Sequence, residues 1–149
     1  MATARDLPLS QFNFLVDFGE DPASPQAGFQ EVSGLGLEVT VAEYRNGNEA
    51  ENAPRKITTM NKVPDVTFKR GVIGALNLYE WINEVRSGSQ ESLRTVTVQL
   101  LSEDRSNVVM EWKLSRARPI KYTGPSLNGK GTDIAIEELV LAAERIEIA

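Results

Sequence analysis

The chain contains no cysteine and no histidine. Disulfide bonds, cysteine nucleophiles, Ser-His-Asp triads and metal sites built on these two residues are therefore excluded. Histidine is the most common general acid–base residue, so its absence argues against an enzyme. The adjacent acidic pairs, Glu103-Asp104 and Glu137-Glu138, would point to opposite faces of a strand and make poor catalytic dyads. We expect no enzymatic activity, no catalytic residue, no cofactor and no metal site.

The chain also has fewer basic than acidic residues, and it has no long apolar run. The formal net charge is −5 at pH 7, which argues against binding a phosphate backbone. No apolar run approaches the roughly 20 residues that cross a bilayer, and the first residues lack the apolar segment of a secretory signal. We therefore expect no membrane insertion by this chain and a cytoplasmic location before any assembly. The length of 149 residues and the hydrophobic fraction of 41% predict one globular domain, residues 1–149.

Alternating apolar residues predict a mainly β chain. Residues 11–18 place Phe12, Phe14, Val16 and Phe18 on one strand face, and the aromatic residues of the chain are expected in the core rather than on a stacking platform. Further strands or extended pieces are expected at 28–32, 35–44, 66–68, 95–101, 108–114 and 119–123. Polar loops are expected at 19–27, 102–107 and 124–131. The last of these, GPSLNGKG, has glycine where a phosphate-binding loop needs serine or threonine, so it is interpreted as a surface turn.

One segment has the period of a helix, at about residues 75–87. Its core-facing stripe is expected to be Leu78, Trp81, Ile82 and Val85, at positions i, i+3, i+4 and i+7. Asn77 or Gly74 is expected to open this helix, and Gly88 to close it. The segment 133–148 is ambiguous, because its composition slightly favours a helix while its apolar alternation also fits a strand.

Residues 46–64 have no sustained apolar period and predict a long extended loop. Loops of this length are uncommon in compact domains and are usually functional or disordered. Charge is separated further along the chain, with a basic excess in residues 105–121 and an acidic excess in residues 132–149. Such separation is explained either by an ordinary solvated surface or by head-to-tail association of copies.

Four short motifs occur in a characteristic order and spacing: Val32–Leu35, Glu43–Gly47, Phe68–Gly71, and Leu78 with Trp81-Ile82. Together, over roughly residues 9–148, they resemble the inner tube proteins of contractile phage tails and contractile injection systems. The resemblance implies a small β-barrel of two packed antiparallel sheets with one flanking helix, similar to the haemolysin-coregulated protein of type VI secretion. It also favours a strand in segment 133–148.

The resemblance implies a structural role without catalysis. Six copies would form a ring, and rings would stack into a hollow conduit for DNA or protein cargo. The implied partners are further copies of this chain, a sheath protein, and initiator and terminator proteins at the baseplate and the far end. The chain would assemble in the bacterial cytoplasm and become part of a virion or injection particle. The long loop would remain mobile until it contacts a neighbouring subunit, through the expected contact residues Asn46, Gly47, Arg55, Lys56, Ile57 and Met60.

Two alternatives remain open at this point. One is an adaptor with the same fold at the baseplate end of the tube. The other, from a different class, is a β-barrel that binds a small ligand, which would need a lined cavity. The sequence does not distinguish a phage from a bacteriocin or an injection system, and it does not place the lumen-lining residues.

Overall fold

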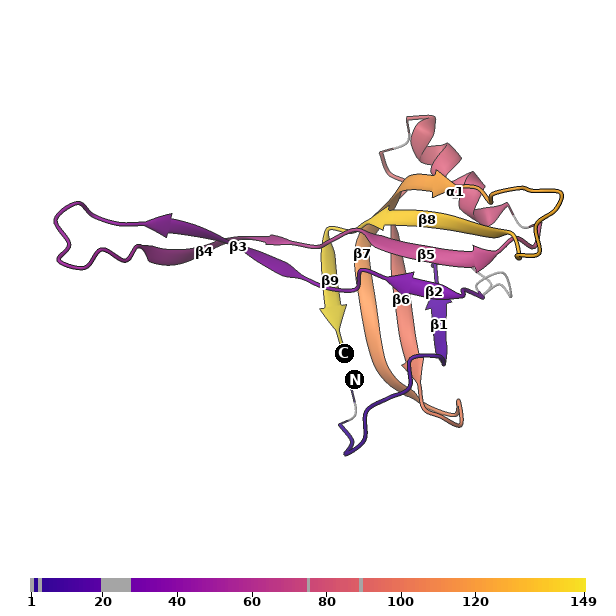
Figure 1. Ribbon diagram of the computed structural model, residues 1–149, viewed down its shortest axis with the longest axis horizontal. Coiled ribbons are helices and arrows are strands. Elements are labelled where there is room, and N and C mark those ends of the chain that lie inside the picture. The colour runs from indigo at the N-terminus through magenta and orange to yellow at the C-terminus, as the bar shows by residue number, and fades with distance from the viewer. Residues whose placement is uncertain (1, 3, 20–27, 75, 89) are drawn as a thin grey trace.

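The computed structural model describes residue 2 and residues 4–19, 28–74, 76–88 and 90–149. Most of the loop expected at 19–27 lies outside these residues. Two antiparallel sheets form the body of the molecule (Figure 1). The first contains β1 (Phe14–Asp17), β6 (Arg94–Leu101), the first half of β7 (Val108–Thr123) and β9 (Arg145–Ile148). The second contains the second half of β7 with β8 (Ile136–Ala142), β5 (Val66–Gly71) and β2 (Glu31–Ser33).

The expectation of a mainly β fold with two packed sheets and one helix is confirmed. The two sheets are joined through β7, which the sequence had suggested as two separate pieces. Within the described residues the barrel does not close on the other side, because β1 pairs only with β6 and β2 pairs only with β5.

A bend in β7 lets one strand serve both sheets. Arg116 has a φ of 54°, a left-handed conformation that is uncommon for a residue with a side chain. The register between β6 and β7 shifts at this point, from Leu114 opposite Val96 to Ala117 opposite Arg94. An irregularity of this kind bends a strand and increases its twist. The segment that pairs with β7 is interrupted at the same point, between β8 and β9.

The C-terminal segment is extended, as the resemblance implies. Although its residues have helix propensity, β8 pairs with β5 and β7. Alternate side chains of β8 point into the core, where Leu139 and Leu141 are fully buried. The slight preference for a helix that composition gave here is therefore wrong. Strand propensity depends strongly on such packing and less on the intrinsic preference of each residue.

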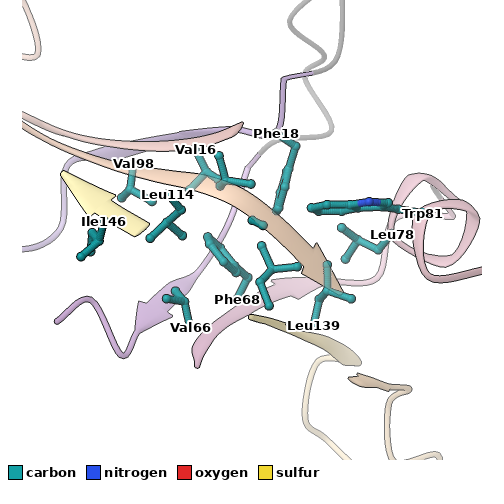
Figure 2. Close-up of a cluster of buried hydrophobic side chains, with 13 residues drawn as sticks. Val16, Phe18, Val66, Phe68, Leu78, Trp81, Val98, Leu114, Leu139 and Ile146 are labelled. Carbon is teal, nitrogen blue, oxygen red and sulfur yellow. The ribbon is translucent and has the colours of Figure 1, made fainter. Parts of the chain in front are cut away.

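The hydrophobic core lies between the two sheets and under helix α1 (Asn77–Arg86) (Figure 2). Leu78 and Trp81 of the helix are buried, and Ile82 and Val85 are half-buried. The indole N–H of Trp81 donates to the carbonyl of Ser92 at 2.9 Å, and the Phe18 ring lies edge-on to Trp81 with 5.7 Å between the ring centres. Gly88 ends the helix at a φ of 97°, the conformation that favours glycine after a helix.

Asn77 does not cap the helix. It is the first helical residue, and its side-chain oxygen instead accepts a hydrogen bond from Arg70 at 2.6 Å. Arg70 is fully buried and forms an ion pair with Glu137 at 2.5 Å. The second carboxylate oxygen of Glu137 accepts from the hydroxyl of Tyr122 at 2.7 Å. This network fixes the start of α1 to strands β5, β7 and β8, and it satisfies a buried charge pair that would otherwise be costly.

The segment expected as one long loop at 46–64 contains a strand. Residues Arg55–Lys62 form strand β4, which pairs with β3 (Glu38–Tyr44) in a separate two-stranded sheet. Only residues 45–54 are a connecting loop. The sequence pattern missed β4 because a strand exposed on both faces has no alternation of apolar and polar residues. Figure 1 shows this hairpin projecting far beyond the two main sheets.

Candidate assembly surface

The projecting hairpin, residues 38–62, is here called the arm. Every residue of its two strands is exposed. The exposed positions include Val41, Ile57 and Met60, and the Met60 side chain is 74% exposed. An isolated two-stranded hairpin is marginally stable in water, because it has no sheet or helix on which to bury an apolar face. The arm is therefore a surface that a contact with another molecule would stabilise.

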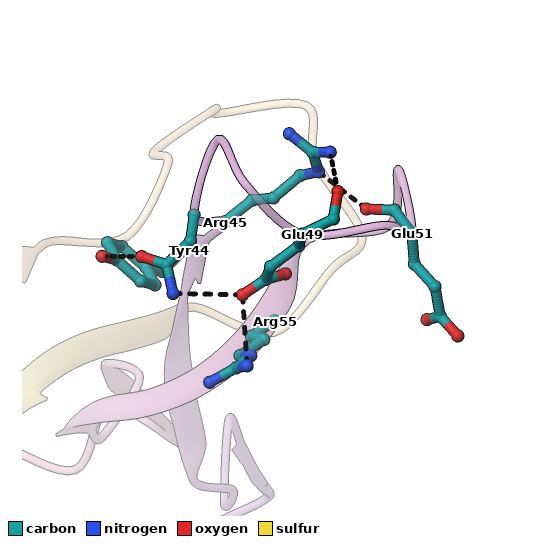
Figure 3. Close-up of polar contacts among 6 residues, drawn as sticks. Tyr44, Arg45, Glu49, Glu51 and Arg55 are labelled. Carbon is teal, nitrogen blue, oxygen red and sulfur yellow. Dashed lines mark hydrogen bonds and ion pairs between the residues drawn. The ribbon is translucent and has the colours of Figure 1, made fainter.

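Polar bonds hold the tip of the arm in a defined shape (Figure 3). Arg45 donates to the carbonyl oxygens of Glu49 and Glu51 at 2.9 and 2.8 Å. The carboxylate of Glu49 accepts from Asn46 at 3.2 Å and forms an ion pair with Arg55 at 3.1 Å. The Tyr44 hydroxyl and the Asn46 side chain are also hydrogen-bonded. The tip loop, which contains no helix or strand, thus satisfies many of its own polar groups.

Two features set the geometry where the arm leaves the body. Val63 packs against the hydrophobic core directly after β4 and anchors the returning strand. On the outgoing side, Gly34 has a φ of 91°, and a Cβ atom there would lie 2.3 Å from the carbonyl oxygen of Asp65. Only glycine permits this close approach of the two chain segments. The motif around Gly34 therefore has a structural reason, because it lets the outgoing segment pass close to Asp65 on the returning segment.

The predicted contact residues all lie on the arm, and the structure divides them between its parts. Asn46 and Gly47 lie in the tip loop, while Arg55, Lys56, Ile57 and Met60 lie on β4. Asn46 is half-buried within the tip network, and the other five are exposed. Their role in contacts between copies stays a prediction. Sequence reasoning missed the contribution of β3, which brings the exposed Val39 and Val41 alongside β4.

A second unpartnered surface lies where the barrel fails to close. A groove of about 710 Å³ runs between the segment around β1 and the segment around β2. We call it the seam groove; six of its lining residues are Phe12, Phe14, Phe29, Val32, Leu35 and Trp112. Phe12 was expected in the core, but it precedes β1 and its side chain is 70% exposed. The pairing of β1 with β6 begins only at Phe14, so Phe12 lies outside it.

Part of the charge separation along the sequence is paired within the fold. The basic stretch of β7 lies beside the acidic stretch of β8 and β9, because these strands are paired. At the bend of β7, Glu144 forms ion pairs with Arg116 at 3.0 Å and with Arg118 at 2.9 Å. These two ion pairs join the basic and the acidic stretch within one copy of the chain.

The part of the chain that the structure describes contains no group of three acidic residues placed to hold a metal ion. None of its helices has the length and apolar character needed to cross a membrane. The burial of Tyr122 and its hydrogen bond to Glu137 raise the pKa of that phenol to about 12. This perturbed group belongs to the network that holds α1 against the strands.

Comparison with solved structures places this arrangement among contractile tubes. The chain is similar to a protein in the cryo-EM structure of the PVC extracellular contractile injection system, sheath-tube complex in the extended state. The two are 29% identical over 95% of this chain and 91% of that chain, with a TM-score of 0.82. The anti-feeding prophage cap, the AFP tube terminating cap, contains a chain that is also 29% identical, over 100% of this chain and 95% of that chain, with a TM-score of 0.83.

Hcp1 from Flavobacterium johnsoniae shares the fold at 15% identity, with 91% and 94% of the two chains covered and a TM-score of 0.54. A comparison with curated proteins found no match. The two sheets, the single helix and the shared arrangement define a structural subunit of a contractile tail tube. A model of the T4-like virus tail tube protein gp19 family matches residues 10–147. The chain belongs to this family, and the ligand-binding barrel is not favoured.

Proposed function

We propose that six copies of this chain form a ring and that rings stack into the hollow inner tube of a contractile particle. The observation that carries the proposal is the arm, whose strands lie wholly exposed, with apolar side chains on both strands that the described part of its own chain leaves uncovered. Residues 38–62 match the roughly 20–30 residues that one partner contributes to a stable interface. An arm of one copy on the body of another is a heterologous contact, which suits open-ended growth.

The proposed partners follow the particles that contain the similar chains. A sheath would surround the tube, because one similar chain lies in a sheath-tube complex. A terminator would close one end and a baseplate the other, since further similar chains lie in a tube terminating cap and in the AFP baseplate. DNA or protein cargo would pass through the lumen. We propose that the subunit assembles in the bacterial cytoplasm and catalyses no reaction.

A second candidate is a tube-end subunit of the same fold. The observation behind it is the similarity to a chain of the AFP baseplate, at 25% identity and a TM-score of 0.80, which is weaker than the similarity to the sheath-tube chain. A main-tube subunit polymerises by itself, whereas a tube-end subunit would stop at one ring without its baseplate partner.

Light scattering of the purified chain over a range of concentrations tests the proposal. The expected result is a particle of six times the mass of one chain that grows into longer species as concentration rises. Single rings at every concentration would favour the tube-end candidate. A monomer at every concentration would contradict both.

A further inference from the structure

Helix α1 joins the sheets at a buried ion pair, which is a costly feature for a protein interior. The side chains of Arg70 and Glu137 are 1% and 5% exposed. A buried ion pair is weak evidence for stability, because apolar residues of similar volume often stabilise a fold equally well or better. We propose that the Arg70–Glu137 pair is a positioning device, which holds α1 in one orientation on the sheet and adds little to the stability of the fold. This role belongs to the single subunit and does not depend on assembly into a tube.

The surroundings of the pair would accept uncharged residues. Arg70 and Glu137 stand directly opposite each other on β5 and β8, and the next pair on the same face is Phe68 and Leu139, both fully buried. The centre of the Phe29 ring lies 5.7 Å from the guanidinium carbon of Arg70. Two apolar side chains at these places would continue the hydrophobic core. Charge is therefore not needed to fill the space.

What the charged groups add is direction. Nε of Arg70 donates to Glu137 at 2.5 Å, and Nη2 donates to Oδ1 of Asn77 at 2.6 Å. The Tyr122 hydroxyl donates to the other oxygen of the Glu137 carboxylate at 2.7 Å. A guanidinium presents its donors in one rigid plane, and hydrogen bonds weaken steeply when they are misaligned. The first residue of α1 is thus held at a fixed angle to strands of the second sheet.

The other attachments of α1 are apolar or act further along the helix. Leu78 and Trp81 are buried in the core, and such apolar contact has no direction. The Trp81 indole bonds to Ser92, which lies between α1 and β6 and belongs to neither sheet, while the Arg94 guanidinium lies 4.7 Å from the centre of the Trp81 ring. Among the described residues, no side chain caps the N-terminus of this helix of 10 residues. A helix this short is marginal by itself, so its start depends on the network.

The start of α1 also determines where several exposed apolar side chains lie. Val72 and Ile73 follow β5, and Leu76 occupies the cap position of α1; all three are exposed. Gly74 lies among them with a φ of 80°, the left-handed conformation that glycine adopts without strain. A change in the orientation of α1 would therefore move this group of side chains relative to the sheets.

A triple apolar variant separates position from stability. Arg70→Met, Glu137→Leu and Tyr122→Phe together remove the network and leave only Asn77, which is half-buried. Urea denaturation should give a midpoint equal to or above that of the native chain. Hydrogen exchange with mass spectrometry should show the amides of residues 80–83, which bond across the first turn of α1, exchanging about tenfold faster or more, with β6 unchanged. Both chains are compared at a concentration where light scattering gives the same species.

A lower urea midpoint, or failure of the triple variant to fold, would overturn the proposal, because the pair would then be needed for stability. Unchanged exchange in α1 would overturn it as well, because the helix would then keep its position without the charges.

Asn77→Ala and Asn83→Ala form a matched pair on the same helix. The first removes only the bond from Arg70 to α1, whereas the Asn83 side chain bonds to Arg86 within the helix. Alanine has the higher helix propensity, so propensity alone predicts slower exchange in both variants. We expect faster exchange at residues 80–83 in Asn77→Ala only. Equal exchange in the two variants, or slower exchange in Asn77→Ala, would overturn the proposal. A native chain that never assembles would contradict the proposed function and would leave these expected results unchanged.

Discussion

At the scale of single residues, Gly34 is the position where the sequence has least freedom. Its φ of 91° and the 2.3 Å approach to the Asp65 carbonyl leave no room for a side chain. We expect Gly34→Ala to lower the free energy of unfolding by about 2–4 kcal/mol, since it combines left-handed strain with overpacking. Urea denaturation measures this. Gly36→Ala is the matched control, because a Cβ atom there would have no neighbour within 4 Å, and its loss should be below about 1 kcal/mol.

Tyr122 gives a prediction in pH. Burial, and the hydrogen bond to Glu137, raise its pKa to about 12 in the folded chain, against an ordinary value near 10. A raised pKa means that the stabilisation is complete below pH 10 and disappears as the pH rises through 12. The native chain should therefore lose more stability than Tyr122→Phe between pH 10 and 12.

At neutral pH the native chain should be more stable than Tyr122→Phe. Tyr122→Phe should cost about 1–3 kcal/mol, because one oxygen of the buried Glu137 carboxylate loses its hydrogen-bond donor. Tyr44→Phe on the exposed arm is the control. It should change neither the free energy of unfolding at neutral pH nor its decrease between pH 10 and 12. The same alkaline slope for the native chain and Tyr122→Phe would show that the phenol is not coupled to folding.

At the scale of elements, the arm is separable from the body. Its strands pair with each other, and the core residues all lie outside it. Deletion of residues 48–59, which removes most of the tip loop and the first five of the 8 residues of β4, should leave the unfolding midpoint of the body unchanged. The same deletion should prevent ring stacking. Tubes of normal length from the deleted chain would contradict the role given to the arm, and a lost unfolding transition would show that the body depends on it.

How far the sequence predicts an element depends on what stabilises that element. Helix α1 and the strands around Val16 and Val96 follow from apolar period, because burial of one face fixes both the period and the structure. Strand β4 has no buried face, so its sequence contains no such signal.

The seam groove could not be predicted either. It depends on which strand edges remain unpaired, and the periodicity within a strand does not contain that information. Phe12 shows this directly, because it continues the alternation of β1 but lies beyond its pairing.

At the scale of the whole molecule, the subunit is one body with an arm and a seam groove that both lack a partner. Family membership defines the subunit as part of a contractile tail tube, and the core accounts for the packing of the two sheets against each other and against α1. The arm explains why the subunit should not remain alone, because its exposed apolar residues are left uncovered by the described part of their own chain. The proposed lumen, the contact with a sheath and the passage of cargo would all depend on this assembly.

Electron microscopy of the purified chain at high concentration is the direct test of assembly. We expect hollow rings with six-fold symmetry that stack into tubes of uniform diameter. Isolated monomers at high concentration, or closed oligomers without a central channel, would contradict this expectation.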